Sequence, residues 1–368
     1  ADTKLTKTPY QKEKFTEEDL LELAKCAEDP KYFMINHCWI QHPTKGRVKF
    51  ELFEYQKELV DCYHKNRYSI ALVSRQMGKS TAAAGYLLWY AMFVPDQTIL
   101  IAAHKYSGAS EIMQRIRFAY ETLPDFIRAG VTSYNKGSLE FDNGSRIIAQ
   151  STTENTGRGL SISLAYLDEF AFVRPNIAKE FWTALSPTLS TGGKCIITST
   201  PNQDDDQFAQ IYREAAKAQD EFGNDTENGL GLNGFKAFNA DWKYHPDRDE
   251  EWASEERNKI GEERFRREHL NEFIAFDETL IDSIKLSLME TKQPYAKMGQ
   301  VRWYRPIRKD KIYMSALDPS LGTGGDSAAI QVYEMPGMKQ VAEWQHNKTT
   351  VQGQIKILRE ILMYIEGE

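Results

Sequence analysis

The residues best suited to chemistry form one short run, Ser74-Arg75-Gln76-Met77-Gly78-Lys79-Ser80, which directly follows an apolar strand candidate at 68–73. A strand, a tight turn ending in Gly-Lys-Ser and a helix present backbone N–H groups and a helix N-terminus to an anion. Lys79 could then reach the β- and γ-phosphates of a nucleotide, and the Ser80 hydroxyl could bind Mg²⁺. The usual loop has a glycine where this chain has Val73, so the run by itself is an imperfect match.

An acidic pair, Asp168-Glu169, follows a second apolar strand candidate at 163–167. An acid at the carboxyl end of a strand beside a phosphate loop is where an Mg²⁺-organising aspartate belongs. The adjacent Glu169 could polarise an attacking water as general base. The simpler interpretation is an acidic pair that caps the next helix. Because both motifs fall in one strand–helix–strand pattern, we favour the catalytic interpretation.

Other polar residues fit the same pocket. The side-chain amide of Gln56 can donate to and accept from an adenine edge at once. Thr198-Ser199-Thr200 lies at the end of a strand candidate at 195–199, where hydroxyls could sense the γ-phosphate. Arg75 or Arg158 could stabilise charge on a transferring phosphoryl group. Ordinary solvated positions remain open for each of these side chains.

The elements that must position these residues alternate between strand and helix along the chain. This alternation predicts an α/β fold, a mostly parallel sheet covered by helices. A hairpin is expected at 138–149 around Asp142-Asn143-Gly144. A helix with a capping box is expected at 16–28, beginning after Thr16. Further expected elements are helices at 52–66, 81–93, 109–123 and 177–185, a strand at 98–103 and a charged helical region at 251–273.

Composition limits the class of protein. The 368 residues suffice for one large or two ordinary domains, and 7 Trp, 18 Tyr and 18 Phe are too many for a disordered chain. No apolar run approaches the length of a membrane span or a signal peptide core. The four cysteines lack metal-ligand spacing, which suits a reducing compartment. With a net charge of −7, any grip on nucleic acid must be a local patch. We therefore expect a soluble, intracellular, two-domain protein.

The run SRQMGKS resembles the deviant phosphate loop of the large terminase subunits of tailed bacteriophages, particularly T-even-like ones, which carry an arginine in this segment. The resemblance continues in chain order and covers nearly the whole chain from about residue 50. Its further matches are YQ (55–56), IAAHKYSGASEI (101–112), LPDF (123–126), YNKGSLEFDNGS (134–145), RGLS (158–161), YLDEF (166–170), ITSTPN (197–202), FRREH (265–269) and ALDPSLGTGGD (316–326). It implies a P-loop NTPase fold of the ASCE type with a small lid subdomain, followed by the start of an RNase H-like nuclease fold.

The resemblance implies an ATP-driven motor that packages double-stranded viral DNA into a prohead, with a nuclease that cuts concatemers. It implies ATP and Mg²⁺ as cofactors, with Mg²⁺ or Mn²⁺ for a complete nuclease. The implied partners are double-stranded DNA, the portal protein of the prohead and the small terminase subunit. A ring of copies is expected on the portal, with a monomer as the alternative for the isolated chain. The implied location is the cytoplasm of the infected bacterial host.

Carried over residue by residue, the resemblance also implies roles. The cofactor-binding set is Gln56, Ser74, Arg75, Gln76, Met77, Gly78, Lys79, Ser80 and Thr81. The catalytic set is Glu169, Lys79, Arg75 acting within the subunit and Arg158 reaching a neighbouring subunit's nucleotide. Ser80 and Asp168 match the Mg²⁺ ligands, and the segment that couples hydrolysis to movement is Thr198, Ser199 and Thr200. Glu51 departs from the second adenine-contacting glutamine of some relatives.

Near the C-terminus, Asp318 ends a strand candidate at 312–318 and matches the first metal ligand of the nuclease, while Asp326 matches a supporting acid. Two-metal chemistry needs several carboxylates from separate strands. The strand that should carry the second ligand would follow the helix expected at 355–364, and these 368 residues do not include it. We therefore expect a chain that hydrolyses ATP without cutting DNA, either a fragment or half of a split protein.

The expected division is a helical segment at 1–50, a P-loop ATPase domain at 51–296 with its lid at about 251–276, a basic linker at 297–311 and an incomplete nuclease domain at 312–368. Trp303 and Tyr304 in the linker could stack on exposed groups of DNA, although a solvated hinge is the plainer interpretation.

Three other functions are compatible with parts of the sequence. A superfamily 2 helicase-like translocase would share Gln56, the Gly-Lys-Ser loop and the acidic pair, but here Phe170-Ala171 follows that pair. A nuclease whose N-terminal half binds nucleotide only structurally is the second. A non-enzymatic docking module at the portal is the third, and the intact Lys79, Asp168 and Glu169 argue against it.

Overall fold

A computed structural model describes residues 5–157, 159–220, 223–273, 292–324 and 326–367. The chain divides into two compact units, Ala1–Ser283 and Ile284–Glu368. Arg158 and the last part of the expected lid, 274–276, lie outside the described residues. None of the described helices is both long and apolar enough to cross a bilayer.

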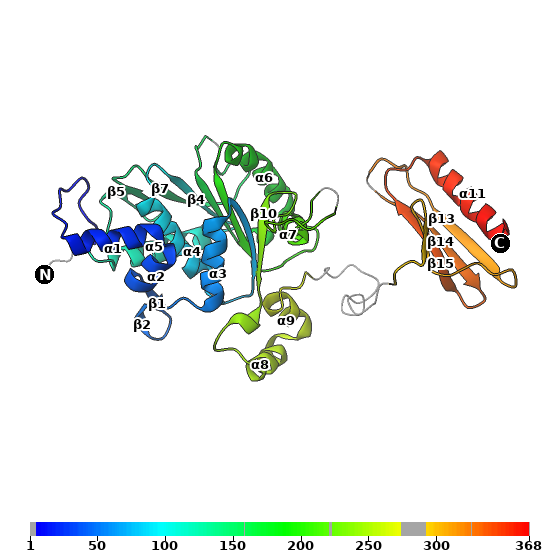
Figure 1. Cartoon of the computed structure of the whole chain (residues 1–368), viewed down its shortest axis with the longest axis horizontal. Coiled ribbons are helices and arrows are strands. Elements are labelled where there is room, and N and C mark those ends of the chain that lie inside the picture. The colour runs from blue at the N-terminus through cyan, green and yellow to red at the C-terminus, as the bar shows by residue number, and fades with distance from the viewer. Residues whose placement is uncertain (1–4, 158, 221–222, 274–291, 325, 368) are drawn as a thin grey trace. The chain divides into compact units, whose positions relative to one another are not determined.

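The first unit consists of an α/β sheet domain and a small helical group (Figure 1). Its helices are α1 (Glu17–Glu28), α2 (Pro30–His37), α3 (Glu54–Lys65), α4 (Lys79–Phe93), α5 (Tyr106–Glu121), η1 (Phe170–Phe172), α6 (Pro175–Ser190), α7 (Gln207–Lys217), η2 (Trp242–Tyr244), α8 (Glu250–Ile260) and α9 (Glu262–His269). Its strands are β1 (Trp39–His42), β2 (Gly46–Lys49), β3 (Tyr68–Val73), β4 (Thr98–Ala103), β5 (Val131–Tyr134), β6 (Ser138–Phe141), β7 (Arg146–Ser151), β8 (Leu164–Asp168), β9 (Lys194–Ser199) and β10 (Phe235–Ala240).

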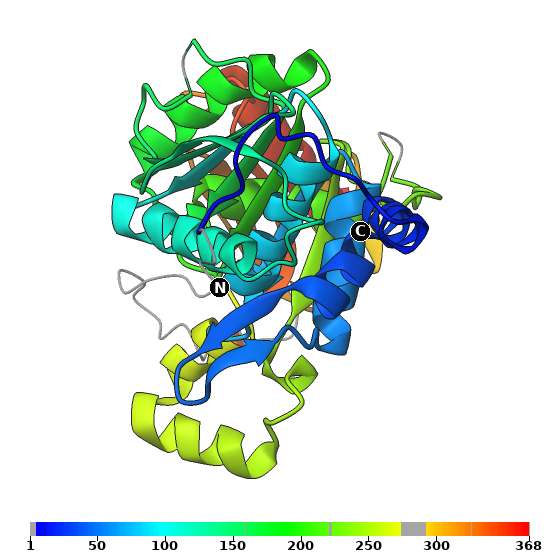
Figure 2. The same ribbon diagram turned by 90° about the vertical axis from the view of Figure 1, so that its left-hand side faces the viewer.

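Among the described residues, the central sheet has eight strands in the order β10-β3-β9-β8-β4-β7-β6-β5. Every pair from β10 to β7 is parallel, and β6 and β5 add an antiparallel edge. Alternate residues of a strand face opposite sides, so Ala71 and Val73 pack with α3, α4 and α5, whereas Ile70 and Leu72 pack with α6 and α7. Figures 1 and 2 show these helices on both faces of the sheet. The predicted α/β fold with a mostly parallel sheet is confirmed.

The N-terminal region is less uniform than predicted. Thr16 caps α1, and its backbone N–H donates in return to Asp19, so the expected capping box is present. The segment predicted as helical at 1–50 also contains the antiparallel pair β1 and β2. Each of these strands has only four residues of mixed polarity, too short a pattern to be distinguished from loop in the sequence.

The charged region at 251–273 forms two short helices, α8 and α9, in place of one long helix. Gly261 separates them with φ 84° and ψ 156°, a conformation that L side chains rarely adopt. Trp242, Ala253 and Phe265 form the small core of this group, which lies below the end of β10 in Figure 1. We call residues 241–273 the lid.

The second unit is an antiparallel sheet with one covering helix. Its strands are β11 (Ala296–Met298), β12 (Val301–Trp303), β13 (Ile312–Asp318), β14 (Ala328–Met335) and β15 (Lys339–His346), paired in the order β11-β12-β15-β14-β13. Ile361 and neighbouring apolar residues of α11 (Val351–Gly367) pack on one face. The strand expected at 312–318 is present as β13, and the helix expected at 355–364 lies within α11.

The stretch at 297–311 was expected to be a linker, and this prediction is wrong. It contains most of β11 and all of β12, which pairs with β15 through Arg302 and Trp303. Trp303 is 1% exposed and belongs to the core of the second unit. Neither the favoured solvated hinge nor the possible stacking of Trp303 on DNA fits the structure, because pairing with β15 places the ring in the core of the second unit.

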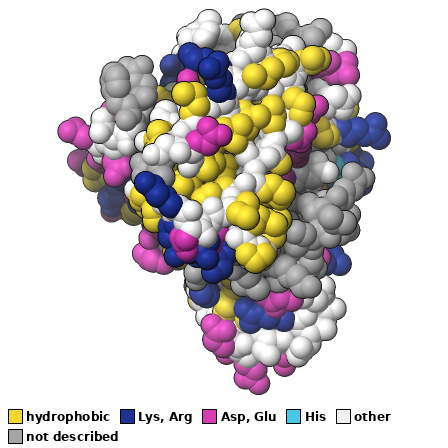
Figure 3. All heavy atoms as spheres, turned by 90° about the vertical axis from the view of Figure 1, so that its right-hand side faces the viewer, with side chains coloured by type: hydrophobic (Ala, Val, Ile, Leu, Met, Phe, Trp, Pro, Cys, Tyr) yellow, Lys and Arg dark blue, Asp and Glu magenta, His cyan; other side chains and the backbone are white. Residues whose placement is uncertain are grey.

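The other face of this sheet carries exposed side chains along the described part of β13. In β13, Ile312, Met314, Ala316 and Asp318 are all exposed, and the strand lies at the end of the sheet. On α11, Ile355 and Met363 are also exposed. Figure 3 shows hydrophobic side chains gathered on the side of the molecule turned to the viewer. Asp318 therefore sits on an open surface at the end of an edge strand.

Candidate active site

Three adjacent parallel strands end at one place in the first unit. Strand β9 pairs with β3 on one side and β8 on the other, and Asp168 lies in register with Thr198. Because parallel strands share their carboxyl edge, the loop after β3, the acidic pair at the end of β8 and the hydroxyl residues at the end of β9 converge. The structure thus brings together three groups that are far apart in the sequence.

Lys79 lies at the centre of this convergence. Its Nζ is 3.3 Å from Asp168 Oδ1 and also contacts Glu169 Oε1. Lys79 is buried, which opposes its charge, but the two carboxylates outweigh burial and raise its pKa above the ordinary value. Burial likewise opposes the charge of Glu169, yet the Lys79 ammonium and bonds from Thr200 and Ser199 lower the pKa of that carboxyl. Lys79 and Glu169 are therefore both ionised at neutral pH.

The residues at the carboxyl end of β9 bind the two carboxylates directly. The Thr198 hydroxyl donates to Asp168 Oδ1 at 3.1 Å. The Ser199 hydroxyl and the Thr200 backbone N–H each donate to Glu169 Oε2 at 3.3 Å. A change at either carboxylate would thus be felt at the end of β9, which is the contact that a coupling segment needs.

The backbone of Glu169 is strained. Its φ of 49° and ψ of 44° place it in the left-handed region, which is uncommon for a residue other than glycine. Such conformations cost about 1–3 kcal/mol and gather at functional sites. The carboxylate of this strained residue contacts the Lys79 ammonium.

The loop between β3 and α4 has a marked polarity. Among the described residues, no acceptor is found for the backbone N–H groups of residues 76–81. The carbonyl oxygens of residues 75–78, in contrast, all accept hydrogen bonds. Gly78 has φ 83°, and a Cβ there would lie 2.7 Å from Gln56 Nε2. The loop thus has free N–H donors on one side and hydrogen-bonded carbonyl groups on the other, which is the arrangement of an anion-binding nest. These residues therefore fit the phosphates of a nucleotide bound with Mg²⁺.

Gln56 lies against this loop rather than free in solution. Its Oε1 accepts from the Phe53 backbone N–H at 2.9 Å, and its Nε2 donates to the Gly78 carbonyl at 3.2 Å. The neighbouring Tyr55 hydroxyl donates to the Met77 carbonyl. Both ends of the Gln56 amide are therefore engaged by backbone, and its contact with adenine stays a prediction.

The lid holds the first residues of the loop. Arg75 donates to Glu268 Oε1 at 3.2 Å, and the Ser74 hydroxyl donates to the His269 carbonyl at 2.7 Å. Asn271 bonds the Leu72 and Ala240 carbonyls through Nδ2. The Arg75 side chain is exposed, and its action within the subunit stays a prediction.

Sequence reasoning missed Arg248, which lies between η2 and α8. Its guanidinium donates to the Arg75 carbonyl at 3.2 and 3.3 Å and to the Gln76 carbonyl at 3.1 Å. The same group lies 4.4 Å from the centre of the Trp252 ring. An arginine in a polar run carries no local signal, so only the spatial approach of the lid could have revealed it.

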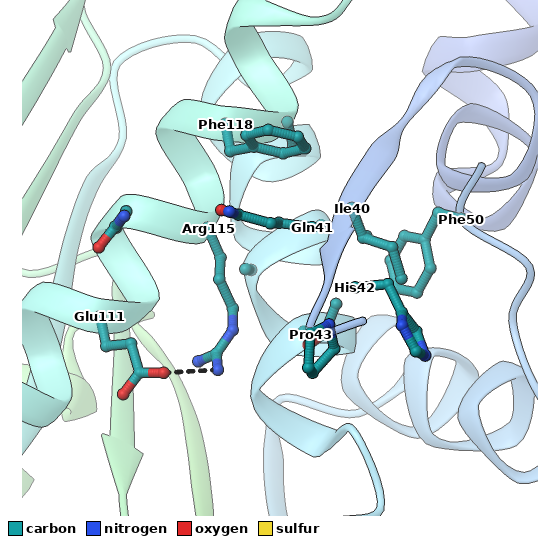
Figure 4. Close-up of a pocket in the computed structure, with 13 residues that line it drawn as sticks. Ile40, Gln41, His42, Pro43, Phe50, Glu111, Arg115 and Phe118 are labelled. Carbon is teal, nitrogen blue, oxygen red and sulfur yellow. Dashed lines mark hydrogen bonds and ion pairs between the residues drawn. The ribbon is translucent and has the colours of Figure 1, made fainter. Parts of the chain in front are cut away.

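A pocket of about 300 Å³ lies between β1 and the helices α4 and α5. Thr81, from the predicted cofactor-binding set, is among its lining residues. Figure 4 shows Arg115 and Glu111 paired on one side of it, opposite His42 and Pro43. This pocket could not be predicted from the sequence, because β1 and β2 were not predicted.

The predicted nuclease residues are arranged differently. Asp318 and Asp326 are both exposed. Among the described residues, the group of three potential metal ligands with atoms within 4.8 Å of one another is Glu22, Cys26 and His37, far along the chain from either aspartate. The described part of the second unit therefore holds no cluster of carboxylates for two metals.

Comparison with known proteins agrees with this geometry. The family model described as "Terminase large subunit, T4likevirus-type, N-terminal" matches residues 70–288. The large terminase subunit of Thermus virus P23-45 is 25% identical over 310 residues, which are 78% of this chain and 62% of that protein. The chain thus spans less than two thirds of the length of that curated relative.

Solved structures show the same fold. The large terminase ATPase domain of Thermus phage P74-26 is 23% identical, with a TM-score of 0.52 over 67% of this chain and 98% of that chain. The large terminase of bacteriophage HK97 is 19% identical, with a TM-score of 0.55 over 84% of this chain and 65% of that chain. At these identities the likeness concerns the fold alone.

Proposed function

The chain belongs to the T4-like family of terminase large subunits, and from this premise we propose that it hydrolyses ATP to move double-stranded viral DNA into a prohead. The observation that carries the proposal is the polarised loop with Lys79, Asp168 and Glu169 at its mouth. Unpaired N–H groups, a buried ammonium and a strained glutamate make a phosphate site prepared for hydrolysis.

The proposed roles follow from these contacts. The N–H groups of residues 76–81 and the Lys79 ammonium would bind the phosphates of ATP. Ser80 and Asp168 would hold Mg²⁺, which neutralises phosphate charge when bound. Glu169 would orient and deprotonate the attacking water, since its carboxylate stays ionised at neutral pH. Ser199 and Thr200 would respond when Glu169 changes partners.

Two arginine roles extend the proposal. Arg75 would act within its own subunit, after leaving Glu268. Arg158 would reach a neighbour's nucleotide, but it lies outside the described residues and stays a prediction from the sequence.

The proposed setting is that of the family. The chain would act in the cytoplasm of an infected bacterium, as a ring on the portal protein of the prohead and with the small terminase subunit delivering DNA. The second unit would be the start of an RNase H-like nuclease with Asp318 and Asp326 as two of its metal ligands. Since two carboxylates cannot hold two metals, we propose that these 368 residues by themselves do not cut DNA.

Phosphate release from ATP tests the proposal. We expect Mg²⁺-dependent turnover by the purified chain, and faster turnover when proheads and double-stranded DNA are added. A strand-separation assay on a forked duplex distinguishes a packaging motor from a helicase-like translocase. ATP turnover without any response to DNA and proheads, or efficient strand separation, would contradict the proposed motor function.

A further inference from the structure

The outward side of the phosphate loop is held by two different parts of the first unit. On one side, Tyr55 and Gln56 at the start of α3 bind the carbonyls of Met77 and Gly78. On the other side, Arg248 from the lid binds the carbonyls of residues 75 and 76. Four consecutive carbonyl groups therefore face donors outside the nest, while the N–H groups of residues 76–81 face away from them.

Arg248 makes more bonds to these carbonyl groups than an ordinary surface arginine would. Its guanidinium makes three bonds to two carbonyl oxygens and lies 3.5 Å from Met77 Sδ. Among the described residues, no carboxylate lies within ion-pair distance of it. Arg248 is half-buried and its guanidinium carbon lies 4.4 Å from the centre of the Trp252 ring, which restrains the side chain.

The orientation of a peptide group links the two sides of the loop. Each peptide plane carries its C=O and the following N–H in opposite directions. A donor that holds the carbonyls of Arg75 and Gln76 outward therefore turns the N–H groups of Gln76 and Met77 inward. The left-handed φ of 58° at Gln76 shows that the loop does not adopt this shape without cost.

We propose that Arg248 is a positioning residue of the phosphate loop, inserted from the lid to keep the loop N–H groups turned toward the nucleotide phosphates. The inference rests on the proposed ATPase function and adds a specific link to it. A lid that moves away would release the carbonyls of residues 75 and 76 and weaken the hold on phosphate. Nucleotide affinity and lid position are thereby coupled through one side chain.

The matched control is Arg257, also in the lid. Its guanidinium lies 4.3 Å from the centre of the Phe265 ring and pairs with Glu262 at 3.4 Å. It stacks on an aromatic ring of the lid as Arg248 does, but no hydrogen bond or ion pair joins it to the loop among the residues that the structure describes. Arg257→Ala therefore reports the loss of lid packing without the loss of loop bonds.

The experiment measures the Kd for ADP by calorimetry for the wild type, Arg248→Ala, Arg248→Lys, Arg257→Ala and Lys79→Ala. We expect Arg248→Ala to weaken ADP binding at least about tenfold, as for the loss of charge-assisted hydrogen bonds. The Kd of Arg248→Lys for ADP should lie between those of the wild type and Arg248→Ala, because an ammonium lacks the forked donors that bond two carbonyl groups. Arg257→Ala should stay within about twofold of the wild type.

Two further readouts separate positioning from folding. Because loop bonds act equally on ground and transition states, Arg248→Ala should raise the KM for ATP by a similar factor with little change in kcat. Millimolar guanidinium ion should restore ADP affinity to Arg248→Ala but not to Lys79→Ala. Circular dichroism shows whether Arg248→Ala is folded. If it is not, the same KM and Kd are measured on the folded Arg248→Lys protein, and these values then decide the inference.

Three results would overturn the inference. These are equal ADP affinity in Arg248→Ala and Arg257→Ala, wild-type affinity in a folded Arg248→Lys protein, or a fall in kcat with an unchanged KM. A wild type that fails to bind ADP would instead contradict the proposed function itself. Failure of the inference and failure of the function are thus distinguishable.

Discussion

Two acidic pairs look alike in the sequence and differ in the structure. Asp168-Glu169 and Asp318 each end an apolar strand, and Asp326 follows Asp318 closely. Strand β8 lies inside a parallel sheet with all five residues buried, whereas β13 is an edge strand with every second residue exposed. The first pair receives a lysine and three hydroxyl residues from neighbouring elements, and the second stands on open surface. A strand-end carboxylate becomes a site only where other elements converge on it.

The largest expected effect is on ATP turnover. Lys79→Ala should abolish it, because the phosphates lose their main cation, and Glu169→Gln should lower it at least ~100-fold while ATP still binds. The same change on the exposed pair, Asp318→Asn, should leave turnover unchanged. Phosphate release and ATP binding are measured on all three variants. Wild-type turnover by Glu169→Gln would remove the difference between the two pairs.

The second expected effect is on stability. Removing Lys79 leaves the buried Asp168 and the half-buried Glu169 without their cation, which should cost about 3 kcal/mol of unfolding free energy at pH 7. Urea unfolding of the nucleotide-free protein measures it. Lys217→Ala, which breaks the exposed pair with Glu214 at 3.2 Å, should change stability little, as surface ion pairs do.

The pH dependence of this cost has a definite sign. In the wild type, the effect of Lys79 outweighs that of burial, so the pKa of Glu169 is lower in the folded protein than in the unfolded chain. The ion pair therefore stabilises the fold at pH values above the unfolded-state pKa. This stabilisation is lost as the pH falls through the folded-state pKa of Glu169. Without Lys79, burial raises that pKa, and the carboxylate costs stability at pH 7 until acid protonates it. The gap in unfolding free energy between Lys79→Ala and the wild type should therefore become smaller at about pH 4. A gap independent of pH would show that the carboxylates are not its cause.

A smaller effect concerns Mg²⁺. Asp168→Asn keeps the shape of the side chain and can still accept from Thr198, but it loses the charge that binds the metal. We expect the Mg²⁺ concentration for half-maximal turnover to rise at least about tenfold. Asp326→Asn serves as the exposed control. An unchanged Mg²⁺ titration would reject the proposed role of Asp168.

The smallest expected effect is on DNA cleavage. Plasmid incubated with this chain and Mg²⁺ or Mn²⁺ should stay intact, and Asp318→Ala should change nothing, since the described carboxylates of the second unit do not cluster. Gel electrophoresis of the plasmid measures this. Cleavage that disappears in Asp318→Ala would show a working metal site and end the contrast between the two pairs.

Much of the first unit could be predicted because its strands are continuous apolar runs. The limits predicted for β3 and β4 agree with the structure, and those of β8 and β9 differ by one residue. Buried parallel strands have this pattern, and Gly and polar residues mark their ends. The β1–β2 pair and β12 were missed, because short strands of mixed polarity are defined by their partners. Trp303 was misplaced for the same reason, since its basic neighbours indicate charge and not burial.

The sequence by itself determined which groups end each strand, and therefore that Lys79, Asp168 and Glu169 share one edge of a parallel sheet. Local patterns suffice there, because parallel pairing places carboxyl ends together. Only the tertiary structure decided what lies outside the phosphate loop. Arg248 and Asn271 reach it from about 170 to 200 residues further along the chain. Their contacts depend on how the lid packs against β3 and β10, and no local sequence pattern encodes that packing.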